Sequence, residues 1–287
     1  DPAPAIAVQA YPGVPVRRIM ELPAKEMTQP KPGVFVFDIG QNMVGWARLR
    51  VRGGAAGQKI TLRFAEVLNP DGTVYIENLR GARATDEIWL NGDEETVWEP
   101  RFTFHGFRYV EVTGYPGTPS LGTVTGVVVH SDTPPTGEFS CSDPMVNQLQ
   151  HNIQWGQRGN FLEVPTDCPQ RDERLGWMGD AHVFCRTACF NMDTAAFFTK
   201  WMQDVEDSQS EAGGFADVAP RAVVQGDAAP AWGDAGIIVP WTIYRCYGDT
   251  RMIAKRYDAM VRWMEYQRGG CEGLIRTGRL NSSYGDW

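Results

Sequence analysis

The chain has 287 residues, 43% of them hydrophobic and 11% aromatic, which is enough apolar material for two domains or one large one. A net charge of -8 without any Lys/Arg run argues against a nucleic-acid partner, and no apolar run reaches the ~18 to 20 residues of a membrane span. Asp1 is not a translational start, so a cytoplasmic and an exported location both stay open.

The cysteine pattern favours neither a zinc site nor a disulfide framework. The six cysteines are few for this length and show no C-x-x-C pair, which argues against a zinc site. We assign no metal ligand and no cofactor, and the sequence does not indicate whether activity depends on a metal. Two of them, Cys185 and Cys189, stand four residues apart in an apolar helical stretch. That spacing usually indicates small side chains that pack in a core.

Residues 3–130 read as strands and turns. Apolar or alternating runs cover 34–37, 44–51 and 59–67, with a predicted turn, D-I-G-Q-N, at 38–42. The pattern continues at 85–90, 96–100, 102–113 and 124–130. Short strands with no helical period between them predict an antiparallel β-sandwich, jelly-roll-like, over residues 1–134. Such sandwiches bind carbohydrate or support a neighbouring domain, and we expect support first.

The composition changes at S-D-T-P-P, residues 131–135, where we predict the domain boundary. Helical periodicity follows at 144–158, 177–207, 233–247 and 250–268, with a Gly/Pro-rich loop at 213–230. Four helices joined by short and long loops predict an array of helical hairpins over 135–287. The chain ends at Y-G-D-W without a helix cap, so we expect a fragment truncated at its C-terminus.

Residues 164–180 form the densest charged segment, V-P-T-D-C-P-Q-R-D-E-R-L-G-W-M-G-D. Two glycines, Gly176 and Gly179, favour a structured loop to about Leu175 and a helix that begins near Trp177. If the helix began earlier, Glu173, Trp177 and Asp180 would share one helical face. Either arrangement brings an acid, an indole and a second acid together.

Two carboxyls on either side of a sugar, one protonated and one ionised, are the usual means of glycoside hydrolysis. The acid needs desolvation or a neighbouring negative charge to keep its proton. Glu173 has Trp177 and other acids nearby in the sequence, and the remaining carboxylates suit sugar hydroxyls. Trp232, Trp241 and Trp287 could supply further flat faces for a sugar.

Structural interpretations compete with each of these. The acids and arginines at 171–174 could form a salt-bridge lattice, which composition alone slightly favours over catalysis. Trp232 and Trp241 stand where core packing is the commoner role, and Asp234 could be a helix N-cap. We expect His182 to be a core histidine and His105 a structural residue at a strand end.

Three runs together resemble bacterial α-L-rhamnosidases of glycoside hydrolase family 78. They are P-T-D-C-P-Q-R-D-E-R-L-G-W-M-G-D at 165–180, D-I-G-Q-N-M-V-G-W at 38–46, and F-T-F-H-G-F-R-Y-V-E-V at 102–112. The resemblance covers most of the chain. It implies a multidomain β + α architecture, a β-sandwich followed by the first helices of an (α/α)6 barrel, and hydrolysis of terminal α-L-rhamnose with inversion.

The resemblance also assigns site residues. Glu173 matches the general acid. The positions that match or adjoin rhamnose-binding residues are Asp167, Arg171, Asp172, Trp177, Asp180, Trp232 and Trp287. The implied partners are rhamnose-containing glycosides or oligosaccharides.

The family's general base is a glutamate from a later part of the barrel, beyond Trp287. Asp234 and Asp286 adjoin indoles, but nothing further supports either as a substitute. We therefore expect this chain alone to be inactive. The alternatives are another hydrolase on the same barrel, or a non-catalytic carbohydrate-binding protein that binds through residues before Pro135. Acids and tryptophans fit neutral sugars better than uronic ones, which would need a free Arg or Lys.

Overall fold

The structure is a computed structural model that describes residues 10–224, 226–277 and 284. By packing, the chain forms two compact units. The sandwich unit comprises Val16–Ser131 and Glu138–Trp177. The helical unit comprises the described residues from Met178 onward, with Asp132–Gly137 and residues 10–15. The packing thus groups Glu138–Trp177 with the strands, and the domain boundary at residues 134/135 stays a prediction.

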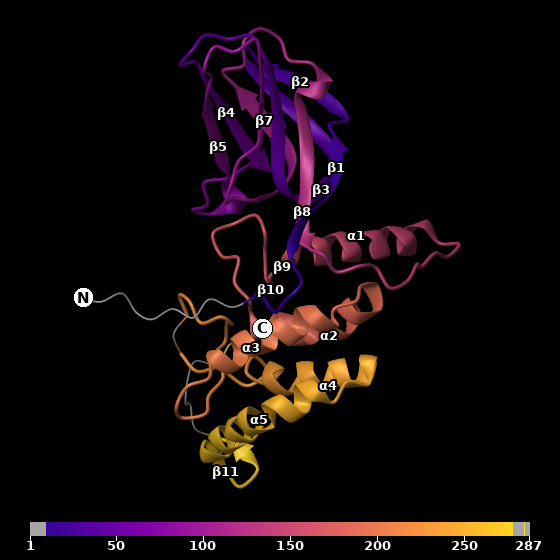
Figure 1. Cartoon of the computed structure of the whole chain (residues 1–287), viewed down its shortest axis with the longest axis vertical. Helices are drawn as coiled ribbons and strands as arrows, with labels where there is room; N and C mark the ends of the chain where they lie inside the picture. The colour runs from indigo at the N-terminus through magenta and orange to yellow at the C-terminus, as the bar shows by residue number, and fades with distance from the viewer. Residues whose placement is uncertain (1–9, 225, 278–283, 285–287) are drawn as a thin grey trace, which may run out of the picture. The chain divides into compact units, whose positions relative to one another are not determined.

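The sandwich unit is an antiparallel β structure, as predicted (Figure 1). Its strands follow the order β1-β8-β3-β7-β4-β5, and β2 and β6 also pair with β3. The strands are β1 (Val16–Pro23), β2 (Glu26–Lys31), β3 (Val34–Arg52), β4 (Lys59–Ala65), β5 (Thr85–Trp89), β6 (Glu95–Trp98), β7 (His105–Thr113) and β8 (Val124–Ser131). A short hairpin, β9 (Phe161–Leu162) and β10 (Val164–Pro165), belongs to the same unit.

The predicted turn at 38–42 is wrong, because the chain continues there as one strand, β3, with a bulge. The register against β7 shifts between Asp38 and Met43. Gly40, at φ 79, donates its backbone N–H to Asp38 Oδ1 at 2.6 Å, so the side chain satisfies the backbone that the bulge displaces. Arg108 donates to the same carboxylate at 2.6 and 2.8 Å. A turn signal therefore became a kink inside a long strand.

Beyond the bulge, β3 changes neighbours and so connects the parts of the sandwich. It pairs with β7 up to Gly45, with β8 from Gly45 and with β6 from Leu49. A Cβ at Gly45 would lie 1.9 Å from the carbonyl oxygen of Val127, so only glycine fits this crossing.

Side chains alternate along these strands, and the inward-facing ones form the core of the sandwich, where Phe37, Phe64 and Phe107 are completely buried. Each such side chain contributes about 1.5 to 3 kcal/mol of apolar burial.

Helix α1 (Pro144–Asn160) packs against β8 and β3 within the sandwich unit. Asp143 accepts a hydrogen bond from the Met145 backbone N–H at 2.8 Å, and Pro144 occupies the first helical position. The expected start at residue 144 is confirmed. Helix α1 also contacts β9, the strand that precedes the charged segment in the chain.

The helical unit contains α2 (Met178–Asn191), α3 (Ala195–Asp207), α4 (Ala235–Tyr247) and α5 (Arg251–Gly269), followed by a hairpin of β11 (Cys271–Glu272) and β12 (Ile275–Arg276). The single helical region predicted over 177–207 is wrong: Thr194 breaks it, donating its backbone N–H to the Tyr247 hydroxyl at 2.9 Å. Helices α1–α5 therefore replace the four expected. Trp201 and Trp263 are fully buried among them.

No helix of the described chain combines the length and apolar character that crossing a bilayer requires.

Candidate active site

The charged loop, residues 166–177, is held against the strands of its own unit. A Cβ at Gly106 would lie 3.0 Å from Gln170 Cβ, so the loop packs closely on the start of β7. Arg174, at φ 56, donates to the Phe104 carbonyl at 2.9 Å and lies 4.4 Å from the centre of the Phe104 ring. Gly81 donates its backbone N–H to Asp172 Oδ2 at 3.1 Å. The sandwich thereby fixes the geometry of the loop.

Glu173 lies at the centre of this loop, with both carboxylate oxygens contacted by donors. Trp177 Nε1 donates to Oε1 at 3.0 Å. Arg171 and Arg80 both donate to Oε2, each at 3.1 Å. The Glu173 side chain is 20% exposed, so solvent reaches it from one side. The predicted contact between an indole and an acid is therefore present, between Trp177 and Glu173. The helical face that Glu173 and Trp177 were expected to share with Asp180 does not form, because helix α2 begins only at Met178.

Arg80 reaches Glu173 from the sandwich, and sequence reasoning missed it. It ends a short 3-10 turn at Glu77–Leu79 and has φ 55, a backbone conformation that costs free energy for a residue with a side chain. Strained backbone of this kind persists where the surroundings enforce it, often at functional sites. Arg80 is 93 residues from Glu173 in the sequence, and nothing local signals the contact.

Asp167 is the most buried acid of the charged loop, with a side chain 7% exposed. Its Oδ1 accepts the Leu175 backbone N–H at 2.9 Å, which closes the loop, and its Oδ2 lies 3.5 Å from Arg171 Nη2. Arg171 therefore bridges Asp167 and Glu173. The salt-bridge lattice that composition favoured is present, and it is built from the same residues as the proposed sugar site.

Asp167, Cys168 and Glu173 place ligand atoms within 4.8 Å of one another, which is close enough for a metal ion. Two observations argue against that use. The guanidinium of Arg171 already contacts both carboxylates. Burial also raises the pKa of the Cys168 thiol to about 11, so the thiolate that would bind a metal is rare near neutral pH. The residues present do not fit a metal centre.

A small pocket of ≈ 270 Å³ adjoins the charged loop within the sandwich unit. Three segments of that unit form its walls: the residues before β5, the residues leading into β7, and the charged loop itself. The lining residues are Ala82, Arg83, Ala84, Thr103, Phe104, His105, Arg171, Asp172, Glu173 and Arg174. The pocket thus offers a place beside Glu173 in which part of a ligand can lie.

The other predicted residues lie in the helical unit or outside the described residues. Asp180 is exposed in the first turn of α2. Trp232 packs over Gly179, where a Cβ would lie 2.8 Å from the indole, and its ring centre is 4.5 Å from that of Tyr284. Trp287 lies outside the described residues. The structure therefore brings five of the predicted residues together in the charged loop: Asp167, Arg171, Asp172, Glu173 and Trp177. In the helical unit it places Trp232 beside Gly179, the neighbour of Asp180 in the chain.

Asp217 is a second carboxyl with an unusual environment, and sequence reasoning missed it. It is 3% exposed within the helical unit, and burial raises its pKa. The Tyr284 hydroxyl donates to it at 3.0 Å and the Ala229 backbone N–H at 3.1 Å. A perturbed buried acid beside aromatic rings is a candidate functional group. The signal was a lone acid in the apolar run F-A-D-V-A, residues 215–219.

Three structural interpretations can be compared with the fold. His105 begins β7, is buried, and pairs with Asp86 at 2.9 Å, so its predicted place at a strand end is confirmed. His182 is half-buried, and burial lowers its pKa, as for a core histidine. Asp234 stands at the N-cap of α4, but its carboxylate accepts from Ala231 N and from Trp263 Nε1 instead of capping the helix.

Two family models match the chain. Residues 134–287 match the bacterial alpha-L-rhamnosidase 6 hairpin glycosidase domain, and residues 28–130 match the bacterial alpha-L-rhamnosidase concanavalin-like domain. The first of these alone covers more than half of the 287 residues.

Individual relatives agree. An alpha-L-rhamnosidase from Streptomyces avermitilis is 55% identical over 273 residues, which are 95% of this chain and 26% of the relative. One from Formosa agariphila is 42% identical over 98% of this chain and 31% of the relative. The crystal structure of the Streptomyces avermitilis enzyme complexed with L-rhamnose superposes with a TM-score of 0.93, at 54% identity, over 97% of this chain and 27% of that one. The chain thus spans between a quarter and a third of the length of these relatives.

Proposed function

The chain belongs to the bacterial α-L-rhamnosidases, and we propose that the complete protein removes terminal, non-reducing α-L-rhamnose from glycosides with inversion at the anomeric carbon. The observation that carries the proposal is the charged loop, in which Glu173 lies between an indole and a lattice of acids and arginines. A salt-bridge lattice alone would not require an adjoining pocket, and this one has a pocket beside Glu173.

We propose Glu173 as the general acid. It would give its proton to the glycosidic oxygen as the C–O bond breaks, while a base takes a proton from the water that attacks the anomeric carbon from the opposite face. Once the proton has left, Arg171, Arg80 and Trp177 are placed to stabilise the resulting carboxylate. In an inverting site the two carboxyls stand about 6.5 to 9.5 Å apart. No residue of this chain is assigned as the base.

The sugar itself would be held by the remaining residues of the predicted set. Each carboxylate oxygen can accept two hydrogen bonds, so Asp167 keeps capacity for sugar hydroxyls beyond its contacts with Leu175 and Arg171. Asp180, Trp232 and Trp287 remain proposed sugar contacts from the helical part of the chain. Indole faces suit the C–H face and the methyl group of a 6-deoxy sugar such as rhamnose.

Proton NMR of the complete protein with an aryl α-L-rhamnoside tests this function. We expect the β-anomer of free rhamnose to appear first and the α-anomer later by mutarotation. Early α-anomer would contradict inversion. Sugar binding without any release would instead favour a non-catalytic carbohydrate-binding protein, with the charged loop as a structural element.

A further inference from the structure

Trp232, in the helical unit, is held by contacts of its ring. A Cβ at Gly179 would lie 2.8 to 3.0 Å from three atoms of the indole, so the ring packs directly on the backbone at the start of α2. The Tyr284 ring contacts the same indole, with the two ring centres 4.5 Å apart. Trp232 Nε1 is buried without a hydrogen-bond partner among the described residues. The position of the indole therefore depends on Gly179 and Tyr284.

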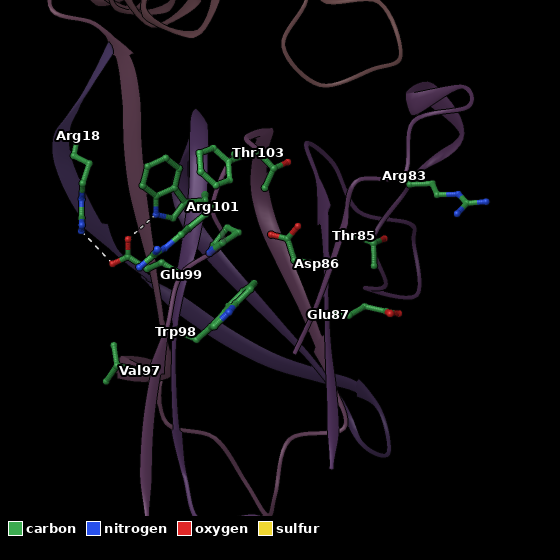
Figure 2. Close-up of a pocket in the computed structure, with 13 residues that line it drawn as sticks. Arg18, Arg83, Thr85, Asp86, Glu87, Val97, Trp98, Glu99, Arg101 and Thr103 are labelled. Atoms are coloured by element: carbon green, nitrogen blue, oxygen red, sulfur yellow. Dashed lines mark hydrogen bonds and ion pairs between the residues drawn. The ribbon is translucent and has the colours of Figure 1, made fainter. Parts of the chain in front are cut away.

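Four other tryptophans of the described chain are fixed through the indole N–H instead. In the sandwich unit, Trp46 donates to Glu99 at 2.8 Å, and Figure 2 shows Arg18 paired with the same carboxylate in the wall of the groove between β5 and β6. The other three donate at 2.9 to 3.0 Å: Trp177 to Glu173, Trp201 to the Ala219 carbonyl and Trp263 to Asp234. A directional bond of this kind sets the orientation of the ring. Trp232 lacks one, so its ring contacts must set its orientation.

Asp217 in turn holds the Tyr284 ring. The Tyr284 hydroxyl donates to Asp217 Oδ2 at 3.0 Å, and the Ala229 backbone N–H donates to Oδ1 at 3.1 Å. Both carboxylate oxygens thus have a donor, which keeps the carboxylate in one orientation. Asp217 is 3% exposed, so water does not compete strongly for these hydrogen bonds. Tyr284 is therefore tethered at its hydroxyl while its ring contacts Trp232.

Asp217 also joins the two segments that meet at the indole. Its backbone carbonyl accepts the Met178 N–H at 2.9 Å, next to Gly179. Ala229, which donates to its carboxylate, belongs to the segment that leads into Trp232. One buried residue thus contacts the chain beneath the indole, the chain that carries the indole, and the tyrosine that packs on it.

The backbone that leads into Trp232 is strained. Ala231 has φ 73, a conformation that is unfavourable for a residue with a side chain. Its N–H donates to Asp234 Oδ2 at 2.8 Å, which holds the segment in this conformation. Strained backbone persists where the surrounding structure enforces it, and it is common at ligand sites. The strain supports a role for Trp232 beyond core packing.

We infer that Asp217 is a positioning residue of the sugar site, which acts through Tyr284 to hold the Trp232 indole in place for rhamnose. The inference rests on the proposed function, in which Trp232 contacts the sugar. A side chain that is held in advance loses less conformational freedom when the ligand binds. The affinity for the sugar therefore depends on the hydrogen bond between Tyr284 and Asp217. This role needs no contact between Asp217 and the sugar.

The test combines calorimetric titration of the complete protein with L-rhamnose and its steady-state hydrolysis of an aryl α-L-rhamnoside. Tyr284→Phe keeps the ring and loses the hydroxyl. We expect its Kd and KM to rise about three- to tenfold, as for the loss of one hydrogen bond. Its kcat should change little, because Trp232 contacts the sugar in the ground state and the transition state alike. Asp217→Ala should weaken binding equally, and the double variant no further, because both changes remove the same hydrogen bond.

Two variants serve as controls. Asp217→Asn keeps an oxygen that can accept from Tyr284, so it should retain most of the affinity. Tyr266→Phe removes the hydroxyl of another tyrosine of the helical unit, whose ring centre is 5.7 Å from that of Trp263. Trp263 is fixed through its own N–H, so Tyr266→Phe should bind L-rhamnose as the wild type does.

Equal Kd values in Tyr284→Phe and Tyr266→Phe would overturn the inference. A lower kcat at unchanged KM and Kd would also overturn it, because a merely structural role reduces the amount of folded protein and leaves its affinity unchanged. If the wild type binds L-rhamnose but does not hydrolyse the rhamnoside, the proposed function is wrong, and the Kd values still decide the inference. If the wild type does not bind L-rhamnose, the inference is wrong.

Discussion

The two units of the chain each contain a notable carboxyl, and the two carboxyls are held in opposite ways. In the sandwich unit, Glu173 is partly exposed and accepts from two guanidiniums and an indole. In the helical unit, Asp217 is 3% exposed and accepts from a phenol and a backbone N–H. Burial raises the pKa of Asp217. Glu173 is thus partly exposed and contacted by charged donors, whereas Asp217 is buried and contacted by neutral ones.

The difference shows what a donor-rich site is suited to do. A general acid must hold a proton before the reaction and carry a negative charge after it. The donors around Glu173 suit the charged product state. Arg80 is the donor that can most easily move away, because its side chain is 56% exposed. We therefore expect the approach of substrate to loosen Arg80, and proton transfer to restore its contact with Glu173.

The largest expected effect comes from Glu173→Gln in the complete protein. An amide cannot give up a proton, so hydrolysis of saccharide leaving groups should fall by about 10²- to 10⁴-fold. Activated aryl rhamnosides, which leave without protonation, should lose far less. Steady-state kcat/KM for a series of leaving groups of falling pKa measures the difference.

Asp217→Asn is the matched control for that series, since it makes the same change in the other unit. It should not show the dependence on leaving group. If Asp217→Asn lost activity selectively on poor leaving groups while Glu173→Gln lost it equally on all, the acid role would move to Asp217 and the comparison would be reversed.

Arg80→Ala should have a smaller effect. Because the pair is partly exposed, we expect a loss of about three- to tenfold in kcat on saccharide substrates, with little change in KM. The split between kcat and KM is the decisive measurement, because a loss confined to kcat indicates an interaction made in the transition state.

Arg80→Lys and Arg50→Ala serve as controls for this variant. The lysine retains the charge and should retain most of the wild-type kcat. Arg50 pairs with Glu95 at the sandwich surface and should be neutral. If Arg80→Ala had the same kcat and KM as Arg50→Ala, the sandwich would only support the charged loop.

Local patterns predicted the parts of the molecule that depend on local sequence. The start of α1 at Pro144 follows from a cap and a proline, and the change from loop to helix near Trp177 follows from glycines. The pairing of Glu173 with Trp177 also joins residues only four apart. In each case the residues that decide the structure are neighbours in the chain.

Long-range contacts decided the rest. The turn signal at 38–42 became a bulge because Asp38 pairs with Arg108 on β7, 70 residues away. The break before α3 depends on Tyr247, 53 residues from Thr194. Arg80 and Asp217 became site candidates only through the fold. Contacts between residues far apart in the sequence leave no local pattern, so they could not be predicted from it.

The smallest expected effect is on stability, from Asp217→Asn. Because burial raises the folded-state pKa of this acid, the folded state holds its proton more tightly than the unfolded state does. The stability that this provides is complete below the unfolded pKa, about 3.8 to 3.9, and is lost as the pH rises through the raised folded value.

The asparagine of the variant stays neutral and keeps a carbonyl oxygen that can accept from Tyr284 or Ala229. Asp217→Asn should therefore match wild type in acid and melt a few degrees higher at neutral pH. Thermal unfolding of the complete protein from pH 4 to 7 measures this difference; a constant offset across that range would show that burial does not raise the pKa of Asp217.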